Sequence, residues 1–202
     1  MPISDRRTGR TSQFVKAQHL SIVCSGITQA MRNQGFPSDE PMEARSVNLA
    51  RRLVGRLPEA GAAYCGPSLR ARQTADLLGI KPTDREALSD QNYGLWTGRS
   101  LLDIEQSDRD GLSAWMSDPS FAPPNGESVA DVARRASEFL DEMRGVPGHV
   151  IAVTHASVAR VVVLDVLEAP LRSFWKIDAP PLCVTDLRFN GTRWVLRGHG
   201  TS

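Results

Sequence analysis

The sequence predicts an α/β fold, a three-layer α/β/α sandwich with a mainly parallel sheet and a C-terminal hairpin. Short apolar runs typical of buried strands alternate along the chain with segments whose apolar residues recur at helical spacing. Near the C-terminus, two strand-like runs flank Asn190-Gly191, a dipeptide that suits a tight hairpin turn. At 202 residues, with 41% hydrophobic and 23% charged residues, the chain has the size and composition of one such domain.

The composition excludes several classes of protein. The formal net charge of +1 gives no electrostatic reason to expect a nucleic-acid or membrane-surface partner. No apolar run approaches membrane-spanning length, so we expect no membrane partner and a cytoplasmic location. Residues 1–17 are polar, and we expect them to form a disordered arm before a domain over residues 18–202. Cys24, Cys65 and Cys183 fit neither a disulfide framework nor a zinc site, so no metal is expected.

The first half of the chain begins with an apolar run over residues 20–28 that ends in a small-residue turn, as a buried strand does. Residues 29–41 are rich in Asn, Gly, Pro and Asp and indicate a loop. Helical spacing of apolar residues predicts a helix over 42–57. A short strand is expected over 62–65, followed after Gly66-Pro67 by a helix that ends near Leu78.

The second half continues the alternation of strands and helices. The expected elements are a short strand over 84–88, an aromatic turn over 93–98, one or two short helices over 99–116, a helix over 129–144 with Ser128 as N-cap, a strand over 148–154, a helix over 158–167 and a hairpin over 182–196. The run at 148–154 is nearly continuously apolar, which is typical of a parallel sheet covered on both faces.

Several short motifs lie where the expected strands end, which is where sites form in open α/β sheets. They are L-S-I-V-C-S-G-I-T (20–28), G-P-S-L-R-A-R-Q-T-A (66–75), L-S-D-Q-N-Y-G-L-W-T-G (88–98), P-N-G-E-S (124–128) and V-T-H-A-S (153–157). As a set they resemble the histidine phosphatase superfamily, phosphoglycerate mutase-like branch. The resemblance implies transfer of a phosphoryl group from a monoester to a histidine without a cofactor, followed by hydrolysis or return transfer.

The resemblance also implies roles for individual residues. Arg70 would bind phosphate through its guanidinium fork, and His155 would donate to the phosphate and stabilise its charge. Asp90 aligns with a proton-donating glutamate, a role that requires a raised pKa. Gly26 and Thr28 remain from the first loop and would let it approach the anion. Each residue alone also has a simpler interpretation: an exposed helix arginine, a structural histidine or a turn aspartate.

The end of the first strand departs from the family. Where the family has Arg-His-Gly, this chain has Cys24-Ser25-Gly26, which lacks both a cation and the nucleophilic histidine. Because losing a covalent nucleophile can cost about 10⁶ in turnover, we expect an inactive or very weak phosphatase with a reduced pocket for phosphate or a small phosphorylated ligand. Two alternatives are a metal-independent phosphomonoesterase that uses Ser25 as nucleophile, and a regulatory or scaffolding protein that uses the fold as a binding surface.

The sequence also predicts how far apart two of the cysteines lie. Cys24 and Cys65 both end expected strands, and in the family both places border the phosphate pocket. We therefore expect Cys24 and Cys65 to lie near each other at the mouth of the site. A disulfide between them would require Cα atoms no more than about 7 Å apart.

Overall fold

The computed structural model describes residues 18–201, so the arm expected over residues 1–17 lies outside the described residues. Its centre is a six-stranded sheet with the order β3-β2-β4-β1-β5-β6. The strands are β1 (Gln18–Cys24), β2 (Ala62–Cys65), β3 (Thr83–Asp84), β4 (His149–Thr154), β5 (Val184–Phe189) and β6 (Trp194–Gly200). β3, β2, β4 and β1 are parallel, whereas β5 and β6 form an antiparallel hairpin against β1. The predicted mainly parallel sheet and C-terminal hairpin are confirmed.

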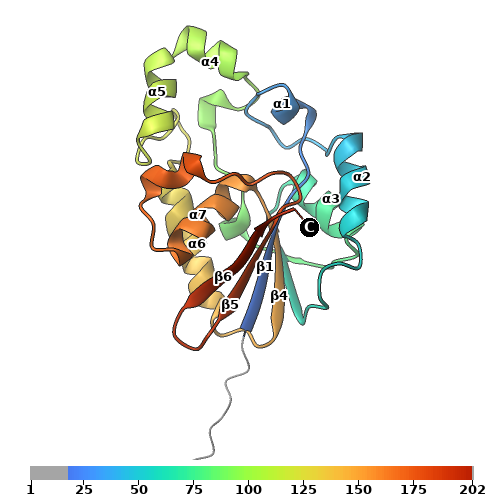
Figure 1. Cartoon of the computed structure of the whole chain (residues 1–202). Coiled ribbons are helices and arrows are strands. Elements are labelled where there is room, and N and C mark those ends of the chain that lie inside the picture. Colours follow the sequence, from blue (N-terminus) through green and yellow to red (C-terminus); the bar gives the residue numbers. More distant parts are fainter. Residues whose placement is uncertain (1–17, 202) are drawn as a thin grey trace, which may run out of the picture.

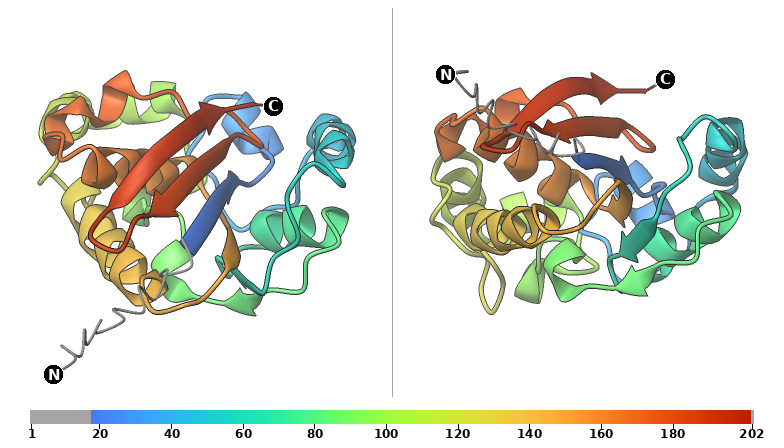
Figure 2. Two further views of the ribbon diagram at one scale, coloured as in Figure 1. Left: turned by 60° about the horizontal axis from the view of Figure 1, so that its bottom comes forward. Right: turned by 90° about the horizontal axis from the view of Figure 1, so that it is seen from below.

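Helices cover both faces of this sheet (Figures 1 and 2). They are α1 (Gln29–Arg32), α2 (Ala44–Leu53), α3 (Leu69–Leu77), α4 (Leu101–Ser107), α5 (Arg109–Ser117), α6 (Val129–Met143) and α7 (Ala156–Val166), with 3-10 helices η1 (Glu86–Leu88), η2 (Gly94–Trp96) and η3 (Leu171–Lys176). Side chains of β1 alternate between the layers, because Ile22 and Cys24 join the core under α6 and α7 while Val23 joins the core under α3. The predicted three-layer sandwich follows from this alternation.

The helix α6 shows how closely the local sequence specifies an element. The Ser128 hydroxyl accepts from the Asp131 backbone N–H at 3.1 Å, and the Asp131 carboxylate accepts from the Ser128 backbone N–H at 3.1 Å, which completes a capping box. One face of the helix is buried, including Phe139 and Leu140, each 1% exposed. Ser128 is confirmed as the N-cap. Among the residues from 18 to 201, no helix is long and apolar enough to cross a membrane.

Two elements differ from the sequence-based expectation. The strand predicted over 84–88 is reduced to Thr83–Asp84, which pair with two residues of β2, and the chain then turns into η1. The expected loop over 29–41 begins with the short helix α1, because the Thr28 side chain caps it by accepting from the Met31 backbone N–H at 3.3 Å. Both differences arise from local hydrogen bonds that periodicity does not reveal.

The helices α4 and α5 lie beyond the carboxyl ends of the parallel strands (Figure 1). They are anchored by an aromatic cluster in which the Phe36 ring centroid lies 5.3 Å from that of Trp96 and 5.5 Å from that of Trp115. Trp115 of α5 also makes an edge contact with Trp175 of η3, with ring centroids 4.5 Å apart. This aromatic cluster forms one wall of the cavity described below.

Candidate functional site

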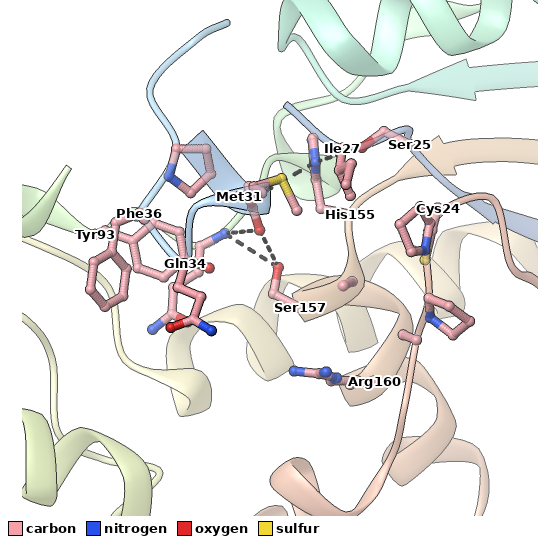
Figure 3. Close-up of a pocket in the computed structure, with 18 of the residues that line it drawn as sticks. Cys24, Ser25, Ile27, Met31, Gln34, Phe36, Tyr93, His155, Ser157 and Arg160 are labelled. Atoms are coloured by element: carbon pink, nitrogen blue, oxygen red, sulfur yellow. Dashed lines mark hydrogen bonds and ion pairs between the residues drawn. The ribbon is translucent and has the colours of Figure 1, made fainter. Parts of the chain in front are cut away.

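The site lies where β1 and β4 end side by side. The Ser25 backbone N–H donates to the Thr154 carbonyl at 2.7 Å, which extends the β1–β4 pairing beyond the last paired residues. This register brings the Ser25 hydroxyl to 3.3 Å from Nδ1 of His155, and both residues are buried (Figure 3). The structure therefore brings together the two residues that the resemblance places at the positions of the family's histidines.

The second ring nitrogen of His155 faces the start of α3. Its Nε2 lies 3.1 Å from the hydroxyl of Ser68, and this hydroxyl also accepts from the Ala71 backbone N–H as the N-cap of α3. The backbone of Gly66 lies close to the ring. A Cβ atom at this position would lie 2.4 Å from the Leu88 carbonyl oxygen and 3.3 Å from Nε2 of His155. The imidazole is thus held from both nitrogens.

Burial, with a smaller contribution from the nearby guanidinium groups of Arg70 and Arg135, lowers the pKa of His155 to about 4, while Asp90 opposes the shift. His155 is consequently neutral near pH 7. A neutral imidazole donates one hydrogen bond and accepts one, and adds no positive charge to the site.

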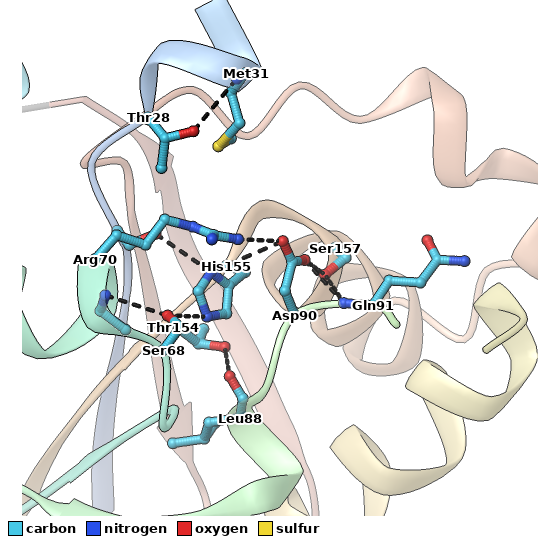
Figure 4. A network of polar contacts seen from close by, with 12 residues as sticks. Thr28, Met31, Ser68, Arg70, Leu88, Asp90, Gln91, Thr154, His155 and Ser157 are labelled. Carbon is cyan, nitrogen blue, oxygen red and sulfur yellow. Dashed lines mark hydrogen bonds and ion pairs between the residues drawn. The ribbon is translucent and has the colours of Figure 1, made fainter. Parts of the chain in front are cut away.

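Arg70 and Asp90 form a close ion pair within this site (Figure 4). The guanidinium of Arg70, which is 3% exposed, donates to Oδ2 of Asp90 at 2.5 Å. The other carboxylate oxygen accepts from the Ser157 hydroxyl at 2.6 Å and from the Gln91 backbone N–H at 2.9 Å. Although burial alone would raise the pKa of Asp90, the charge that His155 acquires at low pH, Arg70 and these hydrogen bonds together hold this pKa below its usual value. Asp90 is therefore ionised, whereas the role of proton donor requires the raised pKa stated above.

Gly26 and Thr28 use their polar groups within the protein. The Gly26 backbone N–H donates to the Thr74 hydroxyl at 3.1 Å, and a Cβ at Gly26 would lie 2.3 Å from the sulfur of Met42. Thr28 is fully buried and caps α1 as described above. Their expected contact with phosphate stays a prediction, and it would require these bonds to be exchanged.

Cys24 and Cys65 do not lie near each other as the sequence analysis expected. Strand β4 separates β1 from β2, which puts their Cα atoms about 9 to 10 Å apart. The two side chains also join cores on opposite faces of the sheet. Cys24 contacts Cys183 instead, with 3.3 Å between the sulfur atoms. The hydrogen bond with Cys183 and complete burial raise the pKa of the Cys24 thiol well above its usual value, so this group is not a thiolate nucleophile.

A cavity of about 500 Å³ opens beside Ser25 and His155 (Figure 3). Five aromatic residues form one side of it, namely Phe36, Tyr93, Trp115, Phe174 and Trp175. The guanidinium of Arg160, from α7, also lines it. Within the described part of the chain, no three metal-ligating side chains gather into a group.

Three polar residues of the site were not identified from the sequence. Ser68 and Ser157 lie inside the motifs that carry the resemblance, and each stands two positions from an identified residue, Arg70 or His155. Their positions at helix starts were a usable signal. Arg160 had no such signal, because its place in the cavity depends on how η3 packs on α7.

Comparison with known proteins gives a consistent result. The sequence profile of the histidine phosphatase superfamily (branch 1) matches residues 20–202. The bifunctional protein Rv2228c of Mycobacterium tuberculosis is 27% identical over 170 residues, which cover 80% of this chain and 47% of that protein. The adenosylcobalamin/alpha-ribazole phosphatase of Escherichia coli is 24% identical over 169 residues, which cover 78% of this chain and 82% of that protein. This chain thus spans about half the length of the mycobacterial relative.

The solved structure of Bacillus stearothermophilus YhfR has the same fold, with a TM-score of 0.82 and 24% identity, covering 92% of this chain and 98% of that one. The profile match extends from the third residue of β1 through the C-terminal hairpin, so it includes every element that builds the site. The chain belongs to the histidine phosphatase superfamily, branch 1.

Proposed function

We propose that this protein is a histidine phosphatase homologue that has lost phosphohistidine chemistry, and that it is an inactive or very weak phosphatase with a reduced phosphate pocket. The observation that carries the proposal is the ion pair between Arg70 and Asp90. A phosphate group that binds Arg70 must compete with a carboxylate that is already in place at 2.5 Å. The retained guanidinium is therefore a weaker anion-binding group than an unpaired one.

The charges of the remaining groups support the same proposal. Arg70 and Asp90 cancel each other, and His155 is neutral because its pKa is about 4. Cys24 stands where the family has a second cation and contributes no charge. The Ser25 hydroxyl, which lies 3.3 Å from His155, is neither charged nor basic. Transition-state stabilisation of a transferring phosphoryl group depends on such cations and donors, so its loss predicts a very slow reaction.

A second candidate function is a phosphomonoesterase that uses Ser25 as nucleophile, favoured by the 3.3 Å contact between Ser25 and Nδ1 of His155. Nδ1 must then be unprotonated to act as base. Two neighbours favour the opposite tautomer: Oδ2 of Asp90 lies 4.0 Å from Nδ1 and attracts a proton there, and the Ser68 hydroxyl can donate to Nε2. In that tautomer His155 donates to Ser25 and does not activate it.

The test is hydrolysis of p-nitrophenyl phosphate by the full chain, by Ser25→Ala and by the matched control Ser113→Ala, whose serine is exposed on α5. We expect all three proteins to show the same rate, at or close to the rate without protein. Turnover by the parent that Ser25→Ala abolishes and Ser113→Ala retains would reject the proposal and establish the second candidate.

A further inference from the structure

Arg160 is a cation without an ion-pair partner among residues 18–201. No carboxylate in that range lies within 4.0 Å of its guanidinium, and its Nε atom is buried without a hydrogen-bond partner. Figure 3 shows the guanidinium pointing into the cavity that Ser25 and His155 also line. Because a buried donor without a partner costs free energy, such a group indicates a partner that residues 18–201 do not supply.

Aromatic rings fix the position of this guanidinium. Its central carbon lies 5.3 Å from the ring centroid of Phe174 and 5.9 Å from that of Trp175, both within the range of cation–π attraction. Phe36, Tyr93 and Trp115 complete the aromatic wall. A cavity of about 500 Å³ has the size of a small-molecule site. The cavity therefore combines a held cation with an extended apolar surface.

The charges around the cavity limit the ligand that it fits. Arg70 is neutralised by Asp90, and His155 is neutral near pH 7. Asp178 also lines the cavity, and no ion pair within 4.0 Å joins it to Arg160. Among the described lining residues, Arg160 is therefore the cation that can pair with a negative charge on a ligand, whereas the carboxylate of Asp178 disfavours a second negative charge there. A doubly charged group would leave an uncompensated charge against aromatic side chains.

We propose that this cavity binds a small organic monoanion, a carboxylate on an aromatic or apolar body, and that Arg160 holds the carboxylate through its guanidinium fork while the aromatic wall packs on the body. Arg160 thereby selects ligands by charge. This inference rests on the proposed function, because it describes a site that retains ligands without converting them.

The test is calorimetric titration of the full chain with 2-naphthoate and with its uncharged counterpart 2-naphthamide. Losing a charge-assisted hydrogen bond commonly changes affinity by about ten-fold or more, so we expect the carboxylate to bind at least about ten times more tightly than the amide. Arg160→Met should remove this preference without weakening the amide. Arg160→Lys, which retains the charge but not the fork, should retain part of it. Arg134→Met, at an exposed arginine of α6, is the matched control and should behave like the parent.

Equal affinity of the parent for the two probes, or no binding of either at millimolar concentration, would overturn the inference. The same holds if Arg160→Met retains the preference, if Arg134→Met loses it, or if inorganic phosphate binds more tightly than 2-naphthoate through Arg160. If Arg160→Met fails to fold, the comparison of the probes on the parent and on Arg160→Lys decides. Hydrolysis of p-nitrophenyl phosphate, measured in parallel in the absence of naphthoate, tests the proposed function separately.

Discussion

The Ser157 hydroxyl donates a 2.6 Å hydrogen bond to Oδ1 of Asp90, on the side of the carboxylate that Arg70 leaves open. Arg70 binds Oδ2, so the carboxylate is held from both sides as a fixed counter-ion. In this arrangement Asp90 occupies Arg70 in the way an anionic ligand would. The guanidinium of Arg70 is thus already paired with the chain's own carboxylate, and removing that carboxylate should free it.

Asp90→Asn should lower the stability of the ligand-free protein and strengthen phosphate binding. Removing one partner of a buried ion pair leaves the Arg70 charge uncompensated, which costs about 3 kcal/mol of unfolding free energy. Phosphate can then supply the missing charge. The parent should bind phosphate with a dissociation constant in the millimolar range or weaker, and the variant about ten-fold more tightly. The measurement is the rise in melting temperature with increasing phosphate concentration.

Asp84→Asn is the matched control for this prediction. Asp84 pairs with Arg72 at 2.5 Å, but each side chain is 51% exposed, so water replaces the lost partner. Its stability and its response to phosphate should remain those of the parent. A phosphate response of Asp90→Asn no larger than that of Asp84→Asn would show that the ion pair does not limit phosphate binding.

The stability of the protein should fall as the pH is lowered from about 6.5 toward 4. The pKa of His155 is about 4 in the folded protein and about 6.5 in the unfolded chain, so the folded state disfavours its protonation. The stability gained by keeping it neutral is complete above pH 6.5 and is lost through this window, by about 3 kcal/mol in total. Burial also lowers the pKa of His19, which adds to the decline in the same direction.

Urea unfolding at pH 7 and pH 4.5 measures this effect. His155→Gln removes the titrating group, so its stability should fall less between the two pH values than that of the parent. The fall should not vanish, because His19 still titrates. An identical fall in the parent and in His155→Gln would mean that the imidazole is not held in its neutral form.

Gly66→Ala should destabilise the protein by about 2 kcal/mol, the usual cost of forcing a methyl group into a packed site. Its Cβ would lie 2.4 Å from the Leu88 carbonyl oxygen, a backbone atom that moves only with the chain around His155. Gly61→Ala, just before the same strand, is the matched control, because its Cβ would meet nothing closer than the His149 carbonyl oxygen at 3.9 Å. Urea unfolding of both variants should separate them clearly, and equal stabilities would contradict the close approach at Gly66.

Restoring the family's first motif should restore some hydrolysis. Ser25→His would place an imidazole beside Arg70 and His155, and Cys24→Arg would return a cation. Because nucleophile and cation act together in the transition state, neither change alone should suffice. Cys24 is buried against the sulfur of Cys183, so we expect the arginine to require Cys183→Ala as well.

The triple variant should hydrolyse p-nitrophenyl phosphate measurably faster than the parent. The gain should disappear when Arg70 or His155 is also replaced by alanine. Cys183→Ala alone is the control and should stay as slow as the parent. A folded triple variant that is as inert as the parent would favour the regulatory or scaffolding interpretation of the fold.

The sequence predicted the fold and the meeting of Ser25, Arg70, Asp90 and His155, because strand-end motifs fix which residues reach the carboxyl edge of a parallel sheet. The predicted proximity of Cys24 and Cys65 was wrong because it depends on strand order. Nothing in the sequence near either cysteine indicates that β4 lies between their strands.

The ion pair between Arg70 and Asp90 was also not predicted from the sequence. Asp90 lies on a loop after η1 whose course is set by tertiary hydrogen bonds such as the one from Ser157. The motif therefore identified both residues but not their pairing. The role of Asp90 as a proton donor stays a prediction, and the lowered pKa of its carboxyl group does not favour it.

The edge contact between Trp115 and Trp175 gives this protein an optical signature of the state of its cavity. Two indole rings 4.5 Å apart at 72° couple electronically, and one belongs to α5 while the other belongs to η3. Any movement that separates these elements changes the coupling and with it the near-ultraviolet circular dichroism. A change in the spacing of α5 and η3, such as a ligand bound between them would cause, can therefore be followed in the unlabelled protein and in real time.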